Sequence, residues 1–250
     1  MIDQQSHRPW PLPSGPWIMS QRWSDLLFAH WPVPVAALRP QIPVRLEIET
    51  FEGTAWIAIV PFRMEAVRPR ALPALPWLSR FPELNVRTYV KLDDRPGVFF
   101  FSLDATNPVA VSVARQWFLL PYFRARITCA RDGEFIAYSS VRTHQGAPPA
   151  RFEARYGPAG DVFQAQPGTL EHFLTERYCL YASGASVGGS SDDLYRAEVH
   201  HGPWPLQPAE ATVTTNSLLA TVGLDDAPEP PPHVLFARSL DVRAWRLRRV

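Results

Sequence analysis

The stretch RFPELNVRTYVKLDDRPGVFFFSLD, residues 80–104, sets ionisable residues among large apolar ones on both sides of a turn-forming segment at 93–97. This pattern predicts a β-hairpin. Glu83, Asn85, Arg87 and Tyr89 fall at every second position. If the strand runs through Asn85, Arg87 and Tyr89 share one of its faces.

Two strand registers remain open for this hairpin. Pairing Leu92 with Val98 places Arg87 opposite Leu103, whereas a slip by one residue places it opposite Asp104. The second register favours a buried ion pair, and the first leaves Arg87 free to bind an anion. The side-chain pattern alone does not choose between them.

The rest of the chain is also rich in strand patterns. A first hairpin is expected over 44–62 across Glu52-Gly53, then a long loop over 63–84, and another hairpin over 123–141 across Asp132-Gly133. Further strands are expected at 21–31, 150–156, 177–183, 194–200, 209–215, 233–238 and 242–248, and short helices at 34–39, 108–118, 169–175 and 217–220.

Many hairpins and little helix predict an α+β, β-dominated fold. The expected architecture is an antiparallel β-barrel or cone with a few short peripheral helices. No internal repeat or low-complexity linker divides the chain, so residues 1–250 are expected to form one domain, with 1–20 as a proline-rich lead-in segment.

The bulk composition is that of an ordinary globular protein, with 250 residues, 46% hydrophobic and 20% charged. A net charge of +1 provides no global field that would favour nucleic acid or an anionic membrane as a partner. No signal peptide or bilayer-spanning stretch is found. The two cysteines, Cys129 and Cys179, read as buried free thiols, and together these features predict a cytoplasmic location.

Familiar catalytic and metal motifs are weak in this chain. Residues 184–188, GASVG, match the G-x-S-x-G hydrolase motif, but no helix pattern follows, so a hairpin turn is the better interpretation. His200 and His201 are adjacent and would point to opposite faces of a strand, which disfavours a shared metal. No dinucleotide or phosphate-binding glycine motif occurs, and we expect neither a metal nor a cofactor.

A set of polar residues gives the better indication of a binding site. Arginine can hold a carboxylate through two parallel hydrogen bonds, although each arginine could instead pair with an acidic residue of the chain itself or cap a loop. The set consists of Arg22, Arg68, Arg70, Glu83, Arg87, Tyr89, Arg115 and Tyr122.

Several stretches in order along the chain resemble the YqjF-like family, an uncharacterised conserved bacterial domain. They are WSDLLFAHWPVP, ETFEGTAWIAIVPFRMEAVRPR, FPELNVRTYV, PGVFFFSLDA, LPYFRARI, LTERYCLYA and VHHGPWPLQ, and the resemblance extends from about Ser20 to Val250. That family is thought to share the fold of acetoacetate decarboxylase. The resemblance therefore implies a β-cone or barrel with helices outside and a central cavity.

The resemblance also implies which pocket residues persist. Acetoacetate decarboxylase forms a Schiff base on one of two adjacent lysines that follow a Tyr-Pro, and here Tyr122 and Phe123 stand at the matching point. The one lysine of this chain, Lys91, lies elsewhere. The decarboxylase's first-strand arginine resembles Arg22, and one of its pocket glutamates resembles Glu83. Its other glutamate falls near 56–59, where this chain is apolar.

Two functions remain open. The first is a cavity that binds a small organic acid or related metabolite without Schiff-base chemistry. The alternative is an enzyme acting on a small carboxylic acid, with Glu83 as general acid or base. The site residues assigned at this point are Glu83 and Tyr122 for catalysis, and Arg22, Arg87, Tyr89 and Arg115 for ligand binding. Exposed aromatic residues such as Trp77 and Trp245 would permit a homo-oligomer.

Overall fold

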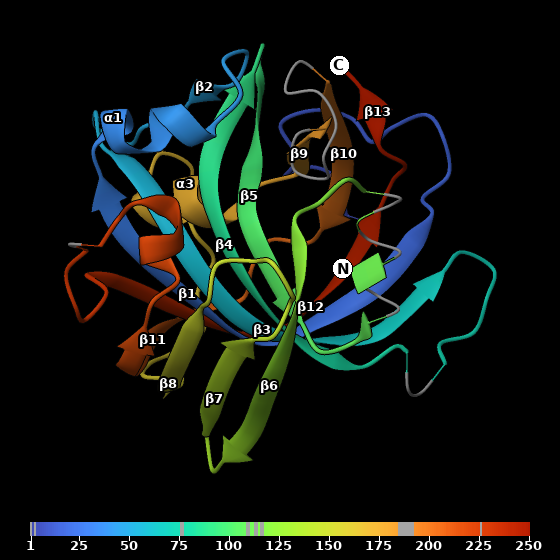
Figure 1. Ribbon diagram of the computed structural model, residues 1–250. Helices are drawn as coiled ribbons and strands as arrows, with labels where there is room; N and C mark the ends of the chain where they lie inside the picture. The colour runs from blue at the N-terminus through green and yellow to red at the C-terminus, as the bar shows by residue number, and fades with distance from the viewer. Residues whose placement is uncertain are drawn as a thin grey trace.

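The computed structural model describes residues 2, 4–75, 78–108, 111–112, 115, 118–184, 193–225 and 227–250. Strands dominate it (Figure 1). They are β1 (Met19–Val33), β2 (Glu47–Ile48), β3 (Ala55–Pro69), β4 (Phe81–Leu92), β5 (Arg95–Ala105), β6 (Tyr122–Asp132), β7 (Phe135–Arg142), β8 (Arg151–Pro158), β9 (Cys179–Ser183), β10 (Leu194–His201), β11 (Leu206–Asn216), β12 (His233–Ala244) and β13 (Arg248–Arg249). The helices described are short: α1 (Val35–Leu38), α3 (Leu170–Thr175) and the 3-10 turns Arg39–Gln41 and Leu219–Val222.

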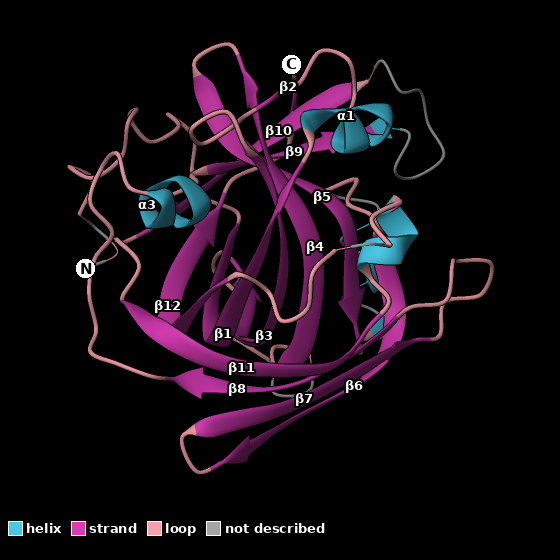
Figure 2. Cartoon of the chain, turned by 90° about the vertical axis from the view of Figure 1, so that its left-hand side faces the viewer, coloured by secondary structure: helices cyan, strands magenta, loops and turns pink. Residues whose placement is uncertain are grey.

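Hydrogen-bonded pairs of the described strands close into two circuits. Nine strands form one circuit, in the order β1, β3, β4, β5, β6, β7, β8, β11 and β12. Seven strands form the other, in the order β1, β3, β4, β5, β9, β10 and β12. Figure 2 shows β11, β8, β7 and β6 as a curved layer beneath β1, β3 and β4. The prediction of a closed β-dominated barrel with few short helices is confirmed.

Two contacts within the barrel are parallel rather than antiparallel. Strand β5 pairs in parallel with β6 and also with β9. A parallel neighbour requires a crossover connection, and the chain between β5 and β6, residues 106–121, is long enough to provide one.

The first predicted hairpin forms only in part: Phe51 and Thr54 pair across the Glu52-Gly53 turn and β3 follows, but the predicted strand before the turn is wrong. Only Glu47–Ile48 forms a strand within 44–50, and this strand pairs with β4 instead of β3. Both edges of β3 are already occupied, by β1 and by β4, so β2 joins β4 at Val90 and Lys91, beyond the last β3 contact at Thr88. The expected loop at 63–84 is also shorter, because β3 continues to Pro69 and β4 begins at Phe81.

The hairpin of residues 80–104 forms, but in neither of the two expected registers. Its turn is tighter than expected: Leu92 pairs with Arg95, and Asp93 has a φ of 53°. Arg87 lies opposite Phe100, because one extra residue, Phe101, interrupts the pairing between Val86–Ser102 and Arg87–Phe100.

Bulges in three strands decide which side chains face the seven-strand circuit. An extra residue inverts the alternation of faces along a strand. The bulges lie at Asp25 in β1, at Ala66 in β3 and at Phe101 in β5; Asp25 and Ala66 have positive φ values of 54° and 50°. Beyond each bulge the next interior-facing residue therefore lies three positions further along instead of two: Leu26 follows Trp23, Val67 follows Met64 and Leu103 follows Phe100.

The nine-strand circuit is filled by a tightly buried core. Its members are fully or almost fully shielded from solvent, as expected for side chains packed at the density of a protein interior. They include Leu27, Ile59, Val86, Tyr138, Phe152, Tyr156 and Phe236.

Several local predictions can be compared with the structure. Thr169 caps α3 by accepting a hydrogen bond from the His172 backbone N–H, as its sequence position indicated. Cys179 is buried and Cys129 is half-buried, and both are free thiols. The predicted G-x-S-x-G turn lies largely outside the described residues, although the Gly184 N–H donates to Asp193 O across its base at 2.8 Å.

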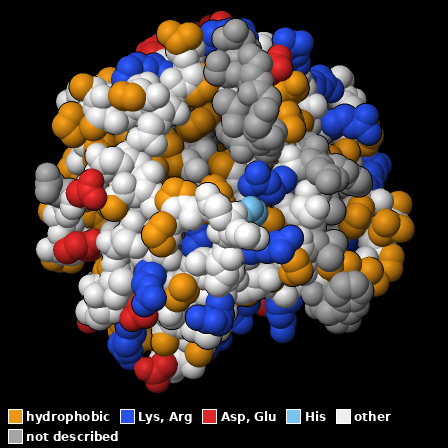
Figure 3. All heavy atoms as spheres, in the orientation of Figure 1, with side chains coloured by type: hydrophobic (Ala, Val, Ile, Leu, Met, Phe, Trp, Pro, Cys, Tyr) orange, Lys and Arg blue, Asp and Glu red, His pale blue; other side chains and the backbone are white. Residues whose placement is uncertain are grey.

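The expectation of exposed aromatic residues for oligomerisation does not hold for Trp245, which is 7% exposed and donates from Nε1 to Gly15 O. Trp77 lies outside the described residues. On the face shown in Figure 3, basic side chains lie in several separate groups among hydrophobic and acidic ones. Within the described part of the chain, no helix is long and apolar enough to cross a membrane.

Candidate functional site

A cavity of about 360 Å³ lies inside the seven-strand circuit. We call it the central cavity. Each of the seven strands contributes at least one lining residue, and most of the lining is apolar. The partly exposed residues Val67, Pro69 and Leu78 are part of the lining, so the cavity opens beside the connection between β3 and β4.

Strand β4 supplies the polar side of the central cavity. Glu83, Asn85 and Arg87 alternate along the strand, and all three line the cavity and are buried. Arg87 lies four positions after Glu83 along the strand, a backbone span of about 13 Å at the usual rise of a β-strand. The cavity therefore has a carboxyl group towards one end and a guanidinium towards the other.

Glu83 forms a direct hydrogen bond to the other predicted catalytic residue. The Tyr122 hydroxyl donates to Glu83 Oε2 at 2.8 Å, and both residues line the cavity. Burial raises the pKa of Glu83 to about 8, because removal from water disfavours the charged carboxylate. Burial and the nearby Glu83 raise the pKa of Tyr122 well above its ordinary value. At neutral pH both groups hold their protons.

Arg87 is a buried cation without a carboxylate partner among the described residues. Its side chain donates from Nη2 to the Leu174 carbonyl at 3.4 Å, a long hydrogen bond, and Nε has no partner. The guanidinium lies 5.4 Å from the ring centroid of Phe28 and 5.9 Å from that of Tyr89. These ring contacts favour a cation, but they do not neutralise it.

Three residues assigned to ligand binding lie outside the cavity lining. Arg22 is about half exposed and pairs with Asp241 at 2.8 Å, because Gln21 and Trp23 on either side of it face inward. Tyr89 is buried behind the lining, where its hydroxyl bonds to His30 Nε2 at 2.8 Å. Arg115 donates to the Tyr122 carbonyl at 2.7 Å and so holds the backbone beside the site.

Other polar residues of the lining were not selected from the sequence. They are Gln21, Thr175, Arg177, His201 and Trp204. His201 is fully buried, and burial lowers its pKa. Arg177 is already neutralised by an ion pair with Glu49. The adjacent histidines gave a partial signal, since the alternation of a strand turns His201 inward, while Nε2 of His200 bonds to Ile2 O at 2.6 Å.

The central cavity offers few groups that are suited to covalent or metal chemistry. Lys91 is outside the cavity and pairs with Glu47 at 3.2 Å. Cys179 does line the cavity, but burial raises the pKa of its thiol to about 12, which disfavours the nucleophilic thiolate. Within the described ranges, no three residues among His, Cys, Asp and Glu are grouped as metal ligands.

Comparison with solved structures shows the same fold. Acetoacetate decarboxylase superposes with a TM-score of 0.64 at 14% identity, over 95% of this chain and 90% of that one. The acetoacetate decarboxylase-like enzyme from Sphingomonas wittichii RW1 has a TM-score of 0.62 at 16% identity, over 98% of each chain. The enduracididine biosynthesis enzyme MppR, complexed with pyruvate, has a TM-score of 0.63 at 13% identity, over 98% of this chain and 93% of that one.

Sequence comparison shows the family. The DUF2071 family, described as an uncharacterized conserved protein, matches residues 20–241. The uncharacterized protein YqjF of Bacillus subtilis (strain 168) is 43% identical over 238 residues, which is 95% of each chain. The chain therefore belongs to the DUF2071 family, is a relative of YqjF and has the fold of acetoacetate decarboxylase.

Proposed function

We propose that the central cavity binds a small organic acid, whose carboxylate pairs with Arg87. The observation that carries this proposal is the buried guanidinium of Arg87, which faces the cavity and has no carboxylate partner among the described residues. A buried unpaired charge costs several kcal/mol, and a bidentate carboxylate would offset much of that cost.

The opposite end of the central cavity suits a neutral polar group of the ligand. Protonated Glu83 has an O–H to donate and a carbonyl oxygen to accept, and Tyr122 stands beside it. The apolar walls between these ends, which include Phe62, Phe100 and Leu103, suit a short carbon chain. A keto or hydroxy acid combines these three features.

The complex of the related fold, MppR, with pyruvate is compatible with this proposal, because pyruvate is a small keto acid. Schiff-base chemistry is not part of the proposal. Tyr122 occupies the position at which the resemblance to acetoacetate decarboxylase would require a lysine, and Lys91 lies outside the lining.

The test is a thermal-shift and calorimetric screen of small carboxylic acids, beginning with pyruvate. Acids that bind the unchanged protein are expected to lose affinity by about tenfold or more in Arg87→Met, since a charge-assisted bidentate contact is lost. Arg126→Met is the matched control, because Arg126 is an exposed arginine of β6 outside the cavity. Equal affinity of an acid for the Arg87→Met variant and the unchanged protein would contradict the proposal.

A second candidate function is favoured by the raised pKa of Glu83. A carboxyl with a pKa of about 8 can serve as a general acid or base near neutral pH. The cavity would then belong to an enzyme acting on a small carboxylic acid. In that case Glu83→Gln abolishes turnover of an acid that still binds, whereas loss of binding alone in this variant would leave only the binding function.

A further inference from the structure

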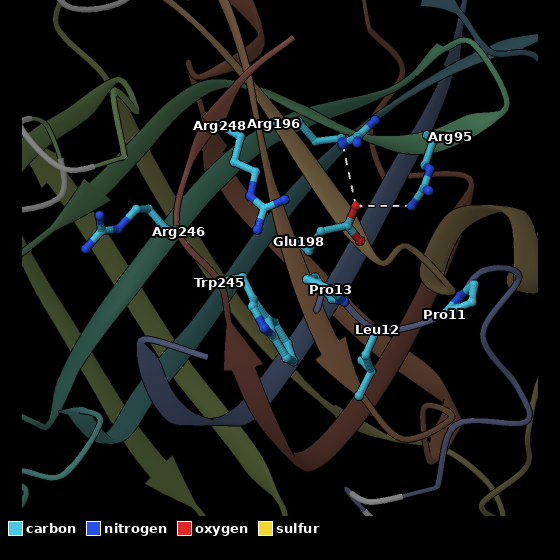
Figure 4. A pocket seen from close by; sticks show the side chains of 9 residues that line it. All are labelled: Pro11, Leu12, Pro13, Arg95, Arg196, Glu198, Trp245, Arg246 and Arg248. Carbon is cyan, nitrogen blue, oxygen red and sulfur yellow. Dashed lines mark hydrogen bonds and ion pairs between the residues drawn. The ribbon is translucent and has the colours of Figure 1, made fainter. Parts of the chain in front are cut away.

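A second concave site lies on the opposite side of the β10 and β12 wall. This surface pocket has a volume of about 260 Å³ and is formed by the lead-in segment, β5, β10 and the C-terminal segment (Figure 4). Neighbouring residues separate the two sites: Val199 lines the central cavity while Glu198 lines the surface pocket, and the same holds for Ala244 and Trp245.

Positive charge is in excess in the surface pocket. Four arginines line it, Arg95, Arg196, Arg246 and Arg248, together with one carboxylate, Glu198. The Oε1 atom of Glu198 is 3.3 Å from Arg95 Nη1 and 3.5 Å from Arg196 Nε. Its Oε2 atom is already bonded to Arg8 Nη2 at 3.2 Å and to Trp10 Nε1 at 2.8 Å. One carboxylate thus serves three arginines.

Two of these arginines lie directly across a strand pair from each other. Arg196 of β10 pairs with Arg248 of β13 in antiparallel register, and both side chains line the pocket. Like charges at directly opposite positions destabilise a sheet. Arg248 and Arg246 are exposed, and neither contacts a carboxylate among the described residues. An anion held between these arginines would remove the repulsion.

The remaining wall of the surface pocket is apolar. Leu12 and Pro13 of the lead-in segment form it with Trp245, whose indole is held by its hydrogen bond of 2.7 Å to Gly15 O. Figure 4 shows Trp245, Leu12 and Pro13 on one side of Glu198 and the side chains of Arg95 and Arg196 on the other. A ligand that fills this space needs an anionic end and an apolar part.

We infer that the surface pocket is a second ligand site, for a small organic phosphate whose phosphate group lies between Arg196 and Arg248. Several guanidinium groups around one concavity suit a compact dianion better than a monocarboxylate, since a phosphate accepts bidentate hydrogen bonds from more than one arginine. The organic part of the ligand packs on Leu12, Pro13 and Trp245. This site is independent of the acid proposed for the central cavity.

Isothermal titration with phenyl phosphate tests the inference. The unchanged protein is expected to bind phenyl phosphate more tightly than inorganic phosphate and not to bind phenol measurably. The double variant Arg246→Gln, Arg248→Gln is expected to weaken binding about tenfold or more, since it removes charge-assisted hydrogen bonds. Two control variants are expected to leave the affinity for phenyl phosphate unchanged. They are Arg126→Gln, which replaces an exposed arginine elsewhere, and the cavity variant Arg87→Met.

Several outcomes would overturn the inference. They are absence of phenyl phosphate binding, equal binding by the double variant, or loss of binding in Arg87→Met, which would place the phosphate in the central cavity instead. Equal affinity for inorganic phosphate would refute the apolar subsite. Vesicles that contain phosphatidic acid test whether the phosphate group belongs to a lipid. Co-sedimentation of the protein with these vesicles that phenyl phosphate does not displace would argue against a small soluble ligand.

Without ligand, Arg248→Gln is expected to raise Tm, because it removes the cross-strand repulsion.

Discussion

Tyr122 donates a 2.8 Å hydrogen bond to Glu83 although their strands, β6 and β4, are not paired with each other. Strand β5 lies between them, and Leu103 of β5 pairs with Asn85 on one side and with Tyr122 on the other. The two side chains therefore meet above β5 inside the central cavity. Their contact joins two strands of the barrel and holds a protonated carboxyl group in an apolar environment.

Glu83→Gln is expected to change the pH dependence of stability. The folded-state pKa of Glu83 is raised to about 8 from an ordinary 4.5, so between these values the folded state retains a proton that the unfolded state releases. The free energy of unfolding then falls as pH rises from 4.5 to 8, by about 5 kcal/mol at most. Urea unfolding across this range is expected to show a smaller decline in Glu83→Gln. Glu210→Gln, at an exposed position, is the control, and parallel curves for Glu83→Gln and the unchanged protein would contradict the prediction.

Tyr122→Phe is expected to raise the pKa of Glu83 still further. The hydroxyl favours the charged carboxylate by donating a hydrogen bond to it, so its removal favours the neutral acid. Carbon-13 NMR of labelled glutamate measures this pKa directly. Tyr138→Phe is a matched control, since the Tyr138 hydroxyl donates to the backbone carbonyl of Glu83 and not to its carboxyl group. Each variant is expected to lose about 1 kcal/mol of stability, and only Tyr122→Phe to shift the pKa.

Arg87→Met is expected to increase the stability of the ligand-free protein. The substitution retains an unbranched side chain of similar length but makes it apolar. It thereby removes a buried cation that no carboxylate neutralises among the described residues. The expected gain is about 1–3 kcal/mol in chemical denaturation. Arg63→Met is the contrasting variant: it takes a partner from the buried Asp25 at 2.8 Å and is expected to destabilise. A loss of stability in Arg87→Met equal to that in Arg63→Met would show that Arg87 is structurally paired.

Asp25→Ala is expected to destabilise the protein by about 3–5 kcal/mol. The Asp25 carboxylate is buried and forms ion pairs with Arg63, Arg131 and Arg238 at 2.8, 2.9 and 3.1 Å. Its φ of 54° also forms the bulge in β1, a conformation that aspartate and asparagine tolerate better than alanine. Asp25→Asn is therefore expected to lose less than Asp25→Ala.

The exposed pair between Asp241 and Arg22 provides the control for Asp25. Because both side chains are about half exposed, Asp241→Ala is expected to cost about 1 kcal/mol or less in the same denaturation experiment. Comparable losses of stability in Asp241→Ala and Asp25→Ala would refute the greater contribution of the buried ion pairs of Asp25.

Gly97→Ala is expected to destabilise the contact between β5 and β9. A Cβ atom at this position would lie 2.7 Å from both the carbonyl oxygen and the Sγ of Cys179, so the backbone of β9 would have to move. Overpacking of this kind costs about 1–3 kcal/mol. At Gly15 the nearest atom to an added Cβ is Arg248 Nη2 at 3.7 Å, an ordinary contact, and Gly15→Ala is expected to be nearly neutral. Similar midpoints for the two variants would count against this packing argument.

Local patterns in the sequence predicted a large part of the fold. The Asp132-Gly133 dipeptide indicated a hairpin turn, which Gly133 and Glu134 form one residue later than predicted. This turn, the Thr169 cap and the alternation along Phe81–Leu92 each depend on a few neighbouring residues, so each could be recognised without knowledge of distant contacts. The same alternation placed Glu83 and Arg87 on one face. The pairing of β2 with β4 could not be recognised in this way, because it depends on which strand edges other parts of the chain leave free.

The sequence by itself determined that the chain is β-dominated, which residues of β4 share a face and which family it resembles. Only the tertiary structure decided that Arg22 faces outward, that Tyr122 reaches Glu83 and that Arg87 has no carboxylate partner among the described residues. The physical reason is the same in each case. Side-chain alternation is a local property, whereas bulges such as those at Asp25 and Phe101, closure of the barrel and burial depend on strands that are distant in the sequence.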